Sequence, residues 1–172
     1  MDELLTDMRH EFRRRKDLAD RAMVQLSDQE FFRRPAGHVN PVALIVKHVA
    51  GNLVSRWTDF LTTDGEKATR DRDGEFLLTE RDTRADLLAA WERGWKTLFD
   101  TLDGMTDADL GKKVTIRGEV HTVRQALLRG VLHVAYHTGQ VLFLVRLLRR
   151  ESTWLTIAPG QSRDQPGIYR RS

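Results

Sequence analysis

The segment from Thr122 to Arg150 constrains the fold most, because its apolar residues recur at alternating three- and four-residue spacing. The positions on this seam are Leu127, Gly130, Val134, His137, Val141, Leu144 and Leu148. Such a seam is typical of a long helix packed in a helix bundle. Thr122 with Gln125 three residues later forms a capping box, which places the start of the helix. Gly130 and His137 are unusual members of an otherwise apolar seam.

Three further segments show the apolar spacing of amphipathic helices. They are residues 2–26, a segment that begins at Asn40-Pro41 and stops at Asp64-Gly65, and residues 83–102. Asn40 is a favoured N-cap residue, and a proline at the first helical position gives up an N–H that would have no partner there. Gly104 follows the third segment in the position favoured for a helix C-cap. The sequence therefore predicts four long helices.

The connections are short or polar. Ser27 with Glu30 predicts a capping box before a short turn over residues 28–32. Residues 66–78 are interpreted as a polar loop, and residues 114–120 alternate around Gly118 as in a small β-hairpin. Because no repeat and no linker between two cores is evident, we expect a single domain over residues 1–172. The fold class expected is all-α, with a β-hairpin before the last helix.

Cysteine is absent from the 172 residues, whereas six histidines are present. The chain therefore has no disulfide framework, no thiolate zinc site and no cysteine nucleophile. Asp2 and Glu3 argue against a secretory signal at the N-terminus. The longest uncharged apolar runs fall far short of the ~20 residues that a membrane-spanning helix needs. We therefore expect a cytoplasmic protein with no membrane partner.

The charge balance argues against a nucleic-acid partner. The formal net charge is only +3, although the isoelectric point is near 9.5. An excess this small is weak for a surface that follows phosphates. The basic run Arg13–Lys16 lies within helical reach of several acids, which are Asp7, Glu11, Asp17 and Asp20. A solvated face with salt bridges is the favoured interpretation of this run.

Two histidines, His133 and His137, lie four residues apart on the predicted last helix. Residues at this spacing point to the same side of a helix, and two histidines can then supply two nitrogen ligands to one metal. The residue after His133 is valine, so the glutamate of a zincin motif is missing. An open catalytic site needs a third ligand. His48 in the second long helix is favoured for it on placement alone, and His10, His38 and His121 are the alternatives. The alternative for each histidine is a core side chain satisfied by one hydrogen bond.

Other catalytic patterns are missing from the sequence. No glycine-rich phosphate loop and no nucleophile elbow is present. Carboxylates are plentiful, but they lie on polar faces and in loops. Trp57, Trp91 and Trp95 have the spacing of core residues and are interpreted as packing side chains. The histidines remain the one candidate constellation.

Four segments together resemble a known family. They are the stretch Asn40–Asn52 around His48, the loop from Asp64 to Phe76, the run His133–Gln140, and Trp154 followed by Pro159-Gly160-Gln161-Ser162. This set is similar to the DinB/YfiT-like superfamily, and within it to a bacterial DinB-like branch. The resemblance extends over about residues 40–162.

The resemblance implies a four-helix bundle of up-down-down-up topology, commonly a homodimer. It further implies a divalent metal, zinc or nickel, held by three histidines. Carried over position by position, these ligands are His48, His133 and His137. Asn52 and Gln140 lie about one turn beyond His48 and His137 and become candidates to support the ligands or to line a pocket. Ordinary polar boundary residues are the alternative for both.

Relatives in that superfamily are metal-dependent transferases or isomerases that use a low-molecular-weight thiol such as bacillithiol or mycothiol. The activity implied is transfer of such a thiol to an electrophile at a three-histidine metal centre. A hydrolase using metal-bound hydroxide, or a non-enzymatic metal-binding or stress-related bundle, are the alternatives. Because the chain has no cysteine, any thiol must come from a small-molecule co-substrate.

Overall fold

The structure is a computed structural model that describes residues 3–149 and 152–161. It is mostly helical, with a two-stranded antiparallel hairpin before the last helix, as the sequence predicts. The elements in chain order are α1 (Glu3–Met23), α2 (Asp28–Phe32), α3 (Val42–Trp57), η1 (Gly74–Phe76), α4 (Arg84–Asp103), η2 (Asp107–Asp109), β1 (Lys113–Ile116), β2 (Glu119–Thr122) and α5 (Val123–Leu148). The 3-10 helices are labelled η.

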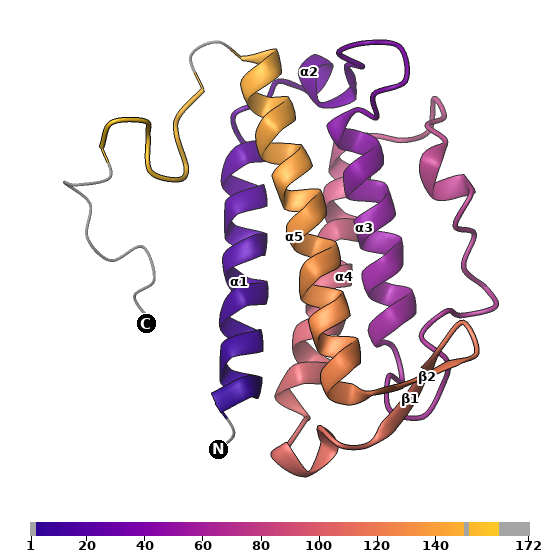
Figure 1. The fold of residues 1–172 in the computed structure, drawn as a ribbon. Helices are drawn as coiled ribbons and strands as arrows, with labels where there is room; N and C mark the ends of the chain where they lie inside the picture. The colour runs from indigo at the N-terminus through magenta and orange to yellow at the C-terminus, as the bar shows by residue number, and fades with distance from the viewer. Residues whose placement is uncertain (1–2, 150–151, 162–172) are drawn as a thin grey trace.

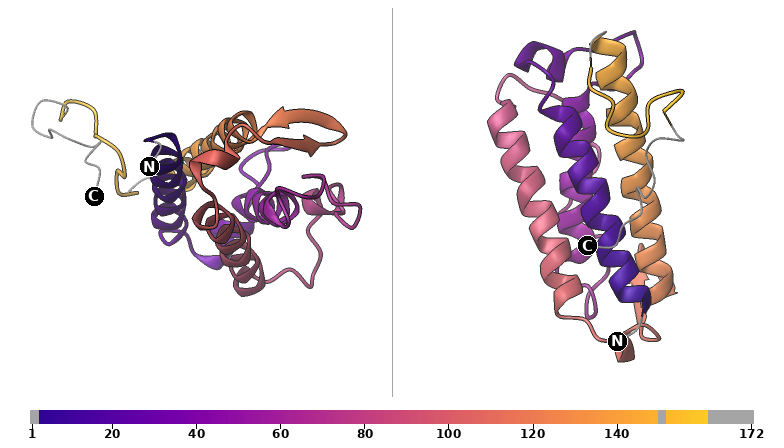
Figure 2. Two further views of the ribbon diagram at one scale, coloured as in Figure 1. Left: turned by 90° about the horizontal axis from the view of Figure 1, so that it is seen from below. Right: turned by 90° about the vertical axis from the view of Figure 1, so that its left-hand side faces the viewer.

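The long helices α1, α3, α4 and α5 lie side by side, and the hairpin extends from one end of them (Figures 1 and 2). The most extensive contacts are those of α3 with α4 and of α1 with α5, and α3 also contacts α5. The buried apolar side chains between these helices form one continuous cluster. The candidate site lies where α3 faces α5.

The packing of Trp57 explains why glycine occupies position 130 on the seam of α5. A Cβ atom at this residue would lie 2.8 Å from Cζ2 of Trp57, so only glycine leaves room for the indole between α3 and α5. The Trp57 ring is 1% exposed and meets the Phe12 ring edge-on, with centroids 5.9 Å apart. Trp91 and Trp95 are buried as well, so the prediction that the three tryptophans pack in the core is confirmed.

Helix α3 differs from its predicted bounds at both ends. Its N-cap is Pro41 and not Asn40: Pro41 is extended, with ψ 164°, and no side chain caps the helix. The helix ends at Trp57 and does not continue to Asp64. Thr58 is already extended, and Asp59 has a left-handed φ of 48°, which a helix cannot continue through.

The predicted caps of the other helices are confirmed. Ser27 with Glu30 and Thr122 with Gln125 form complete capping boxes. Gly104 is the C-cap of α4, but its φ of −79° is right-handed. The position therefore does not need the left-handed conformation for which glycine is usually selected at a helix end.

The hairpin is tied to the chain that follows α3. Arg117 and Gly118 both have positive φ, 57° and 76°, as a two-residue hairpin turn of the I′ kind requires. The Asp64 carboxylate accepts hydrogen bonds from the backbone N–H groups of Gly118, Glu66 and Arg117. These bonds, the one from Gly118 foremost, lower the pKa of Asp64 to about 2. They also place the Arg117 side chain at the edge of the candidate site.

The basic run of α1 is paired as predicted. Arg15 bonds Glu11 at 2.8 Å, and Lys16 bonds Asp20 at 2.6 Å and Glu92 of α4 at 2.7 Å. Arg14, Arg15 and Lys16 are thus paired with acids of α1 and α4, and Arg13 lies over the Phe99 ring. This face of α1 is a salt-bridged surface.

Among the described residues, α5 is one helix that is long and apolar enough, by length and composition, to cross a membrane, and a third of its most apolar window is buried. This is weak evidence, since core helices of soluble proteins pass the same test. After α5, residues 152–161 include a turn in which Gln161 N–H donates to Ala158 and Gly160 has φ 83°. Ser162 and the polar tail lie outside the described residues.

Candidate metal site

Three histidines converge between α3 and α5. His48 lies in the middle of α3 and is 5% exposed, while His133 and His137 are one turn apart on α5 and half-buried. The ring centroid of His48 lies 5.4 Å from that of His133 and 5.0 Å from that of His137. One nitrogen from each ring can be chosen so that all three lie within 4.8 Å of one another. In the described part of the chain, no other group of three His, Asp or Glu side chains is close enough to hold a metal ion.

The arrangement of ring nitrogens fits a metal. Two nitrogens bound to one tetrahedral zinc at 2.0–2.1 Å lie about 3.3 Å apart. The Nε2 atoms of His48 and His133 are separated by 3.3 Å. An N–H···N hydrogen bond has a similar length, so the separation fits a metal without requiring one. In His48 and His137 the Nδ1 atom is engaged elsewhere, which leaves Nε2 of each ring for a ligand.

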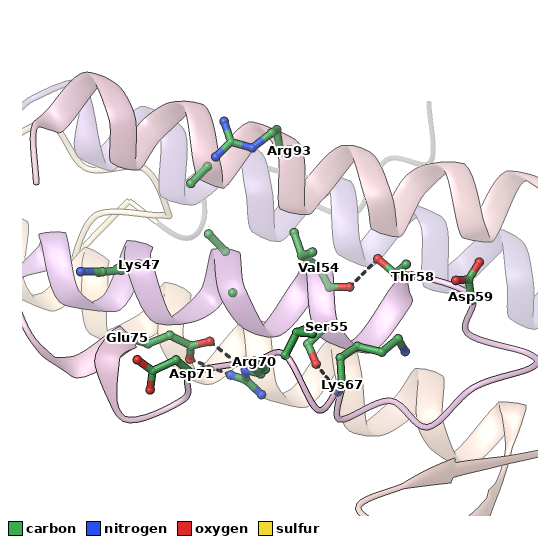
Figure 3. A pocket seen from close by; sticks show the side chains of 14 residues that line it. Lys47, Val54, Ser55, Thr58, Asp59, Lys67, Arg70, Asp71, Glu75 and Arg93 are labelled. Atoms are coloured by element: carbon green, nitrogen blue, oxygen red, sulfur yellow. Dashed lines mark hydrogen bonds and ion pairs between the residues drawn. The ribbon is translucent and has the colours of Figure 1, made fainter.

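A buried carboxylate orients His48. Oε2 of Glu75, in η1, lies 2.8 Å from His48 Nδ1, and both residues are buried. Arg70 donates from Nε and Nη2 to the two oxygens of Glu75 at 2.7 Å (Figure 3). Burial opposes the charge of Glu75, but the hydrogen bonds from His48 and Arg70 outweigh it and hold its pKa below the ordinary value. An ionised Glu75 fixes His48 with the proton on Nδ1, the arrangement common for metal-binding histidines.

Gly51 makes room for this carboxylate. A Cβ atom on Gly51 would lie 2.1 Å from Oε1 of Glu75 and 2.7 Å from its carboxyl carbon. The close approach brings the loop that carries Glu75 against α3, one turn beyond His48. Glycine at this position is therefore part of the support of the site.

Gln140 supports the third histidine. Its side-chain oxygen lies 2.8 Å from Nδ1 of His137, one turn earlier on α5. Asn52, the other supporting candidate, is half-buried and lines a cavity with His48 and His133. His133 has no such support: its Nδ1 atom is buried and has no hydrogen-bond partner among the described residues.

The histidines of α5 are neutral at pH 7. Burial, followed by the neighbouring His137 and His48, lowers the pKa of His133 to about 3. Burial also lowers the pKa of His137, although the bond to Gln140 opposes the shift. Neutral imidazole is the form that binds a metal. These two nitrogens are therefore available as ligands without first losing a proton.

Two cavities adjoin the histidines. One, of about 180 Å³, is shared by His48, His133 and a group of arginines. The other, of about 370 Å³, is shared by all three histidines and includes Phe76 and Tyr136. A third cavity, of about 640 Å³, lies beyond Glu75 between α3 and α4 (Figure 3). The histidines are thus reachable by small molecules.

The other three histidines lie outside the cluster. His10 lines a separate cavity on α1, His38 is exposed before α3, and His121 is in β2. The sequence did not single out Glu75 or Arg70, because the 66–78 segment has no periodicity and was expected to be a polar loop. The signal that exists is the Gly74-Glu75-Phe76 triplet, which belongs to the loop quoted for the family resemblance.

The chain belongs to the family described as "Protein of unknown function (DUF1572)", whose model matches residues 1–161. This range includes the three histidines, Glu75 and the whole of the helical fold. No curated protein and no solved structure matches the chain.

Proposed function

We propose that this protein is a DinB-like metal-dependent enzyme that transfers a low-molecular-weight thiol to an electrophile. The observation that carries the proposal is the convergence of three histidines, two of them supported by Glu75 and Gln140, beside two cavities. The order of the long helices in Figure 1 supports the up-down-down-up bundle of that superfamily, since α1 and α5 run one way and α3 and α4 the other.

His48, His133 and His137 are the residues that would hold the metal, zinc or nickel. A divalent ion held by neutral histidines lowers the pKa of a bound thiol or water and supplies an anionic nucleophile near neutral pH. Glu75 and Gln140 hold two of the rings through Nδ1 and so limit their rotation. A metal held by only these three histidines would keep a coordination position for a small molecule, as catalytic sites with three protein ligands do.

The two cavities favour a reaction between two small molecules. Both include His48 and His133, so molecules bound in the two cavities meet at the same imidazoles. The 370 Å³ cavity has apolar and aromatic side chains in part of its wall, from Ile45, Phe76 and Tyr136, which suit the carbon skeleton of an electrophile. Because the chain has no cysteine, the thiol enters from solution.

The test is a turnover assay with untagged, zinc- or nickel-loaded protein, bacillithiol or mycothiol, and monochlorobimane as electrophile. We expect conjugate to form at least about tenfold faster than without protein, and a chelator to abolish the increase. If the protein hydrolyses p-nitrophenyl acetate without thiol and forms no conjugate, the proposed activity is hydrolysis and not thiol transfer. Bound metal without turnover in either assay would overturn the enzyme proposal in favour of a non-enzymatic metal-binding bundle.

We further propose that two copies of the chain pair through the outer face of α5. Five large apolar side chains are exposed there at helical spacing: Leu128, Leu132, Tyr136, Phe143 and Leu147. Exposed fractions of 53–67% for such residues on one helix are typical of an interaction surface. Tyr136 also lines the larger cavity and contacts His137, so this surface is next to the site.

Light scattering measures this pairing directly. We expect a dimer for the wild type and a monomer for Leu132→Glu, because the new charge would be buried in the interface without a partner. Exposed Val120, in the hairpin and outside this face, provides the matched control Val120→Glu, which should stay dimeric. A monomeric wild type at micromolar concentration would contradict the proposal.

A further inference from the structure

The smaller cavity beside the histidines is lined by an unusual concentration of arginines. The residues that line it are His48, Asn52, Arg56, Arg70, Arg72, Arg117, Arg129, Gly130 and His133. Five of these are arginines, and none of these lining residues, all in the described part of the chain, carries a carboxylate. The arginines come from α3, from the loop after it, from the hairpin turn and from α5.

Only part of this positive charge is balanced. Arg70 is paired with Glu75 and Glu66, and Arg117 with Glu66 at 3.3 Å. The other three, Arg56, Arg72 and Arg129, form no ion pair with any described carboxylate. Three of the five arginines that line the cavity are therefore not neutralised by an ion pair with a described carboxylate.

The pKa of Arg56 is affected by burial and by the neighbouring charge. Its side chain is buried and bonds the carbonyl oxygen of Gly65 through Nε at 3.3 Å. Burial and the charge of Arg129 lower the pKa of Arg56 to about 10, although Glu66 opposes the shift. A negative charge in the cavity would offset the part of this shift that comes from Arg129.

We propose that a substrate of this site carries a carboxylate or phosphate group that binds in the arginine-lined cavity, next to His48 and His133. The inference rests on the proposed function, for which it names the substrate class. Guanidinium groups bind carboxylate and phosphate oxygens through paired hydrogen bonds, so the chemistry of the cavity suits both. Arg72 and Arg129 supply the unpaired charges nearest to solvent, and Arg56 supplies the buried one.

The volume of the arginine-lined cavity fits a small anionic group. About 180 Å³ holds a small charged group but not a whole drug-sized ligand, which needs at least about 300 Å³. The rest of such a molecule then reaches the histidines, which also line the 370 Å³ cavity where a second molecule can contact Phe76 and Tyr136. Arg72 lines both cavities and so lies along the path between them.

The test is a calorimetric titration of the full chain with malonate and, separately, with inorganic phosphate, in metal-free and zinc-loaded protein. We expect at least one anion to bind in both forms of the protein. Arg72→Gln and Arg129→Gln should each weaken that binding about tenfold, because each removes charge-assisted hydrogen bonds. Both residues are exposed, so neither change disturbs the core. Arg124→Gln, on α5 but outside the cavity, is the control of equal charge and should leave the affinity unchanged.

The two anions separate the two sources of negative charge, and weaker binding in the arginine variants identifies the cavity as the binding site. Tighter binding of malonate assigns a carboxylate substrate, and tighter binding of phosphate assigns a phosphorylated one. Failure of both anions to bind would overturn the inference. So would binding that occurs only in the zinc-loaded protein and is unchanged in both arginine variants, because the anion would then be held by the metal alone. Zinc content, measured on the same samples, reports on the proposed metal site independently of these outcomes.

Discussion

Replacing His133 with alanine is expected to abolish stoichiometric metal binding and to weaken the affinity by more than about 100-fold. Loss of a residue that only supports a ligand costs 10–100-fold in metal affinity, so loss of a ligand itself costs more. His133 is the critical member because its Nε2 atom lies 3.3 Å from that of His48 and its ring lies 4.6 Å from that of His137. Elemental analysis of untagged protein and a zinc titration measure both quantities.

His121→Ala is the matched control for this change. His121 is half-buried in β2, outside the cluster, and loses the same atoms on substitution. The wild type and His121→Ala should both gain thermal stability when zinc is added, since a metal that binds only the folded state stabilises it in proportion to the logarithm of its concentration. His133→Ala should gain none. Equal metal content in the two variants would show that His133 is not a metal ligand.

The sequence predicts the helices because their signals are local. Apolar spacing along α5 and the Thr122–Gln125 box define that helix without reference to the rest of the chain. The end of α3 is different: Phe60 continues the apolar spacing and is buried against Trp57, with ring centroids 4.7 Å apart. Phe60 reaches the core from a turn and not from a helix. Periodicity alone cannot distinguish these two cases.

The site is predictable only in part, for a related reason. His133 and His137 share one helix, so their spacing brings them together in any fold that forms it. His48 comes from α3, and its approach to α5 depends on how two helices pack, which periodicity does not specify. Placement on the second helix favoured His48 only over other candidates, and the family resemblance assigned it. Glu75 was missed because a non-periodic loop places it, and its burial requires Gly51 on the facing helix.

Replacing Glu75 with glutamine is expected to weaken metal binding by about 10–100-fold, the second largest effect. Glutamine has nearly the same shape but no charge, and its NH2 group replaces one of the two accepting oxygens. At Oε1 this group faces the donor Nε of Arg70, and at Oε2 it faces the donors Nη2 of Arg70 and Nδ1 of His48. The partner that fixes the His48 proton on Nδ1 and directs Nε2 toward the other histidines is thereby weakened. A zinc competition assay measures the change in affinity.

Two further variants separate the support of His48 from the pairing of Arg70. Glu66→Gln removes the other carboxylate on Arg70, which lies 3.0 Å from Nη1, and leaves the contact between Glu75 and His48 intact. It should lower metal affinity less than about threefold, since an ion pair at this distance from the ligands contributes little to them. Gly51→Ala should instead reproduce most of the Glu75→Gln effect without changing any charge, because its Cβ atom occupies the position of Oε1 and displaces the carboxylate from His48. If Glu66→Gln and Glu75→Gln weaken metal binding equally while Gly51→Ala does not, Glu75 acts only through Arg70 and the loop, and its role in orienting His48 is refuted.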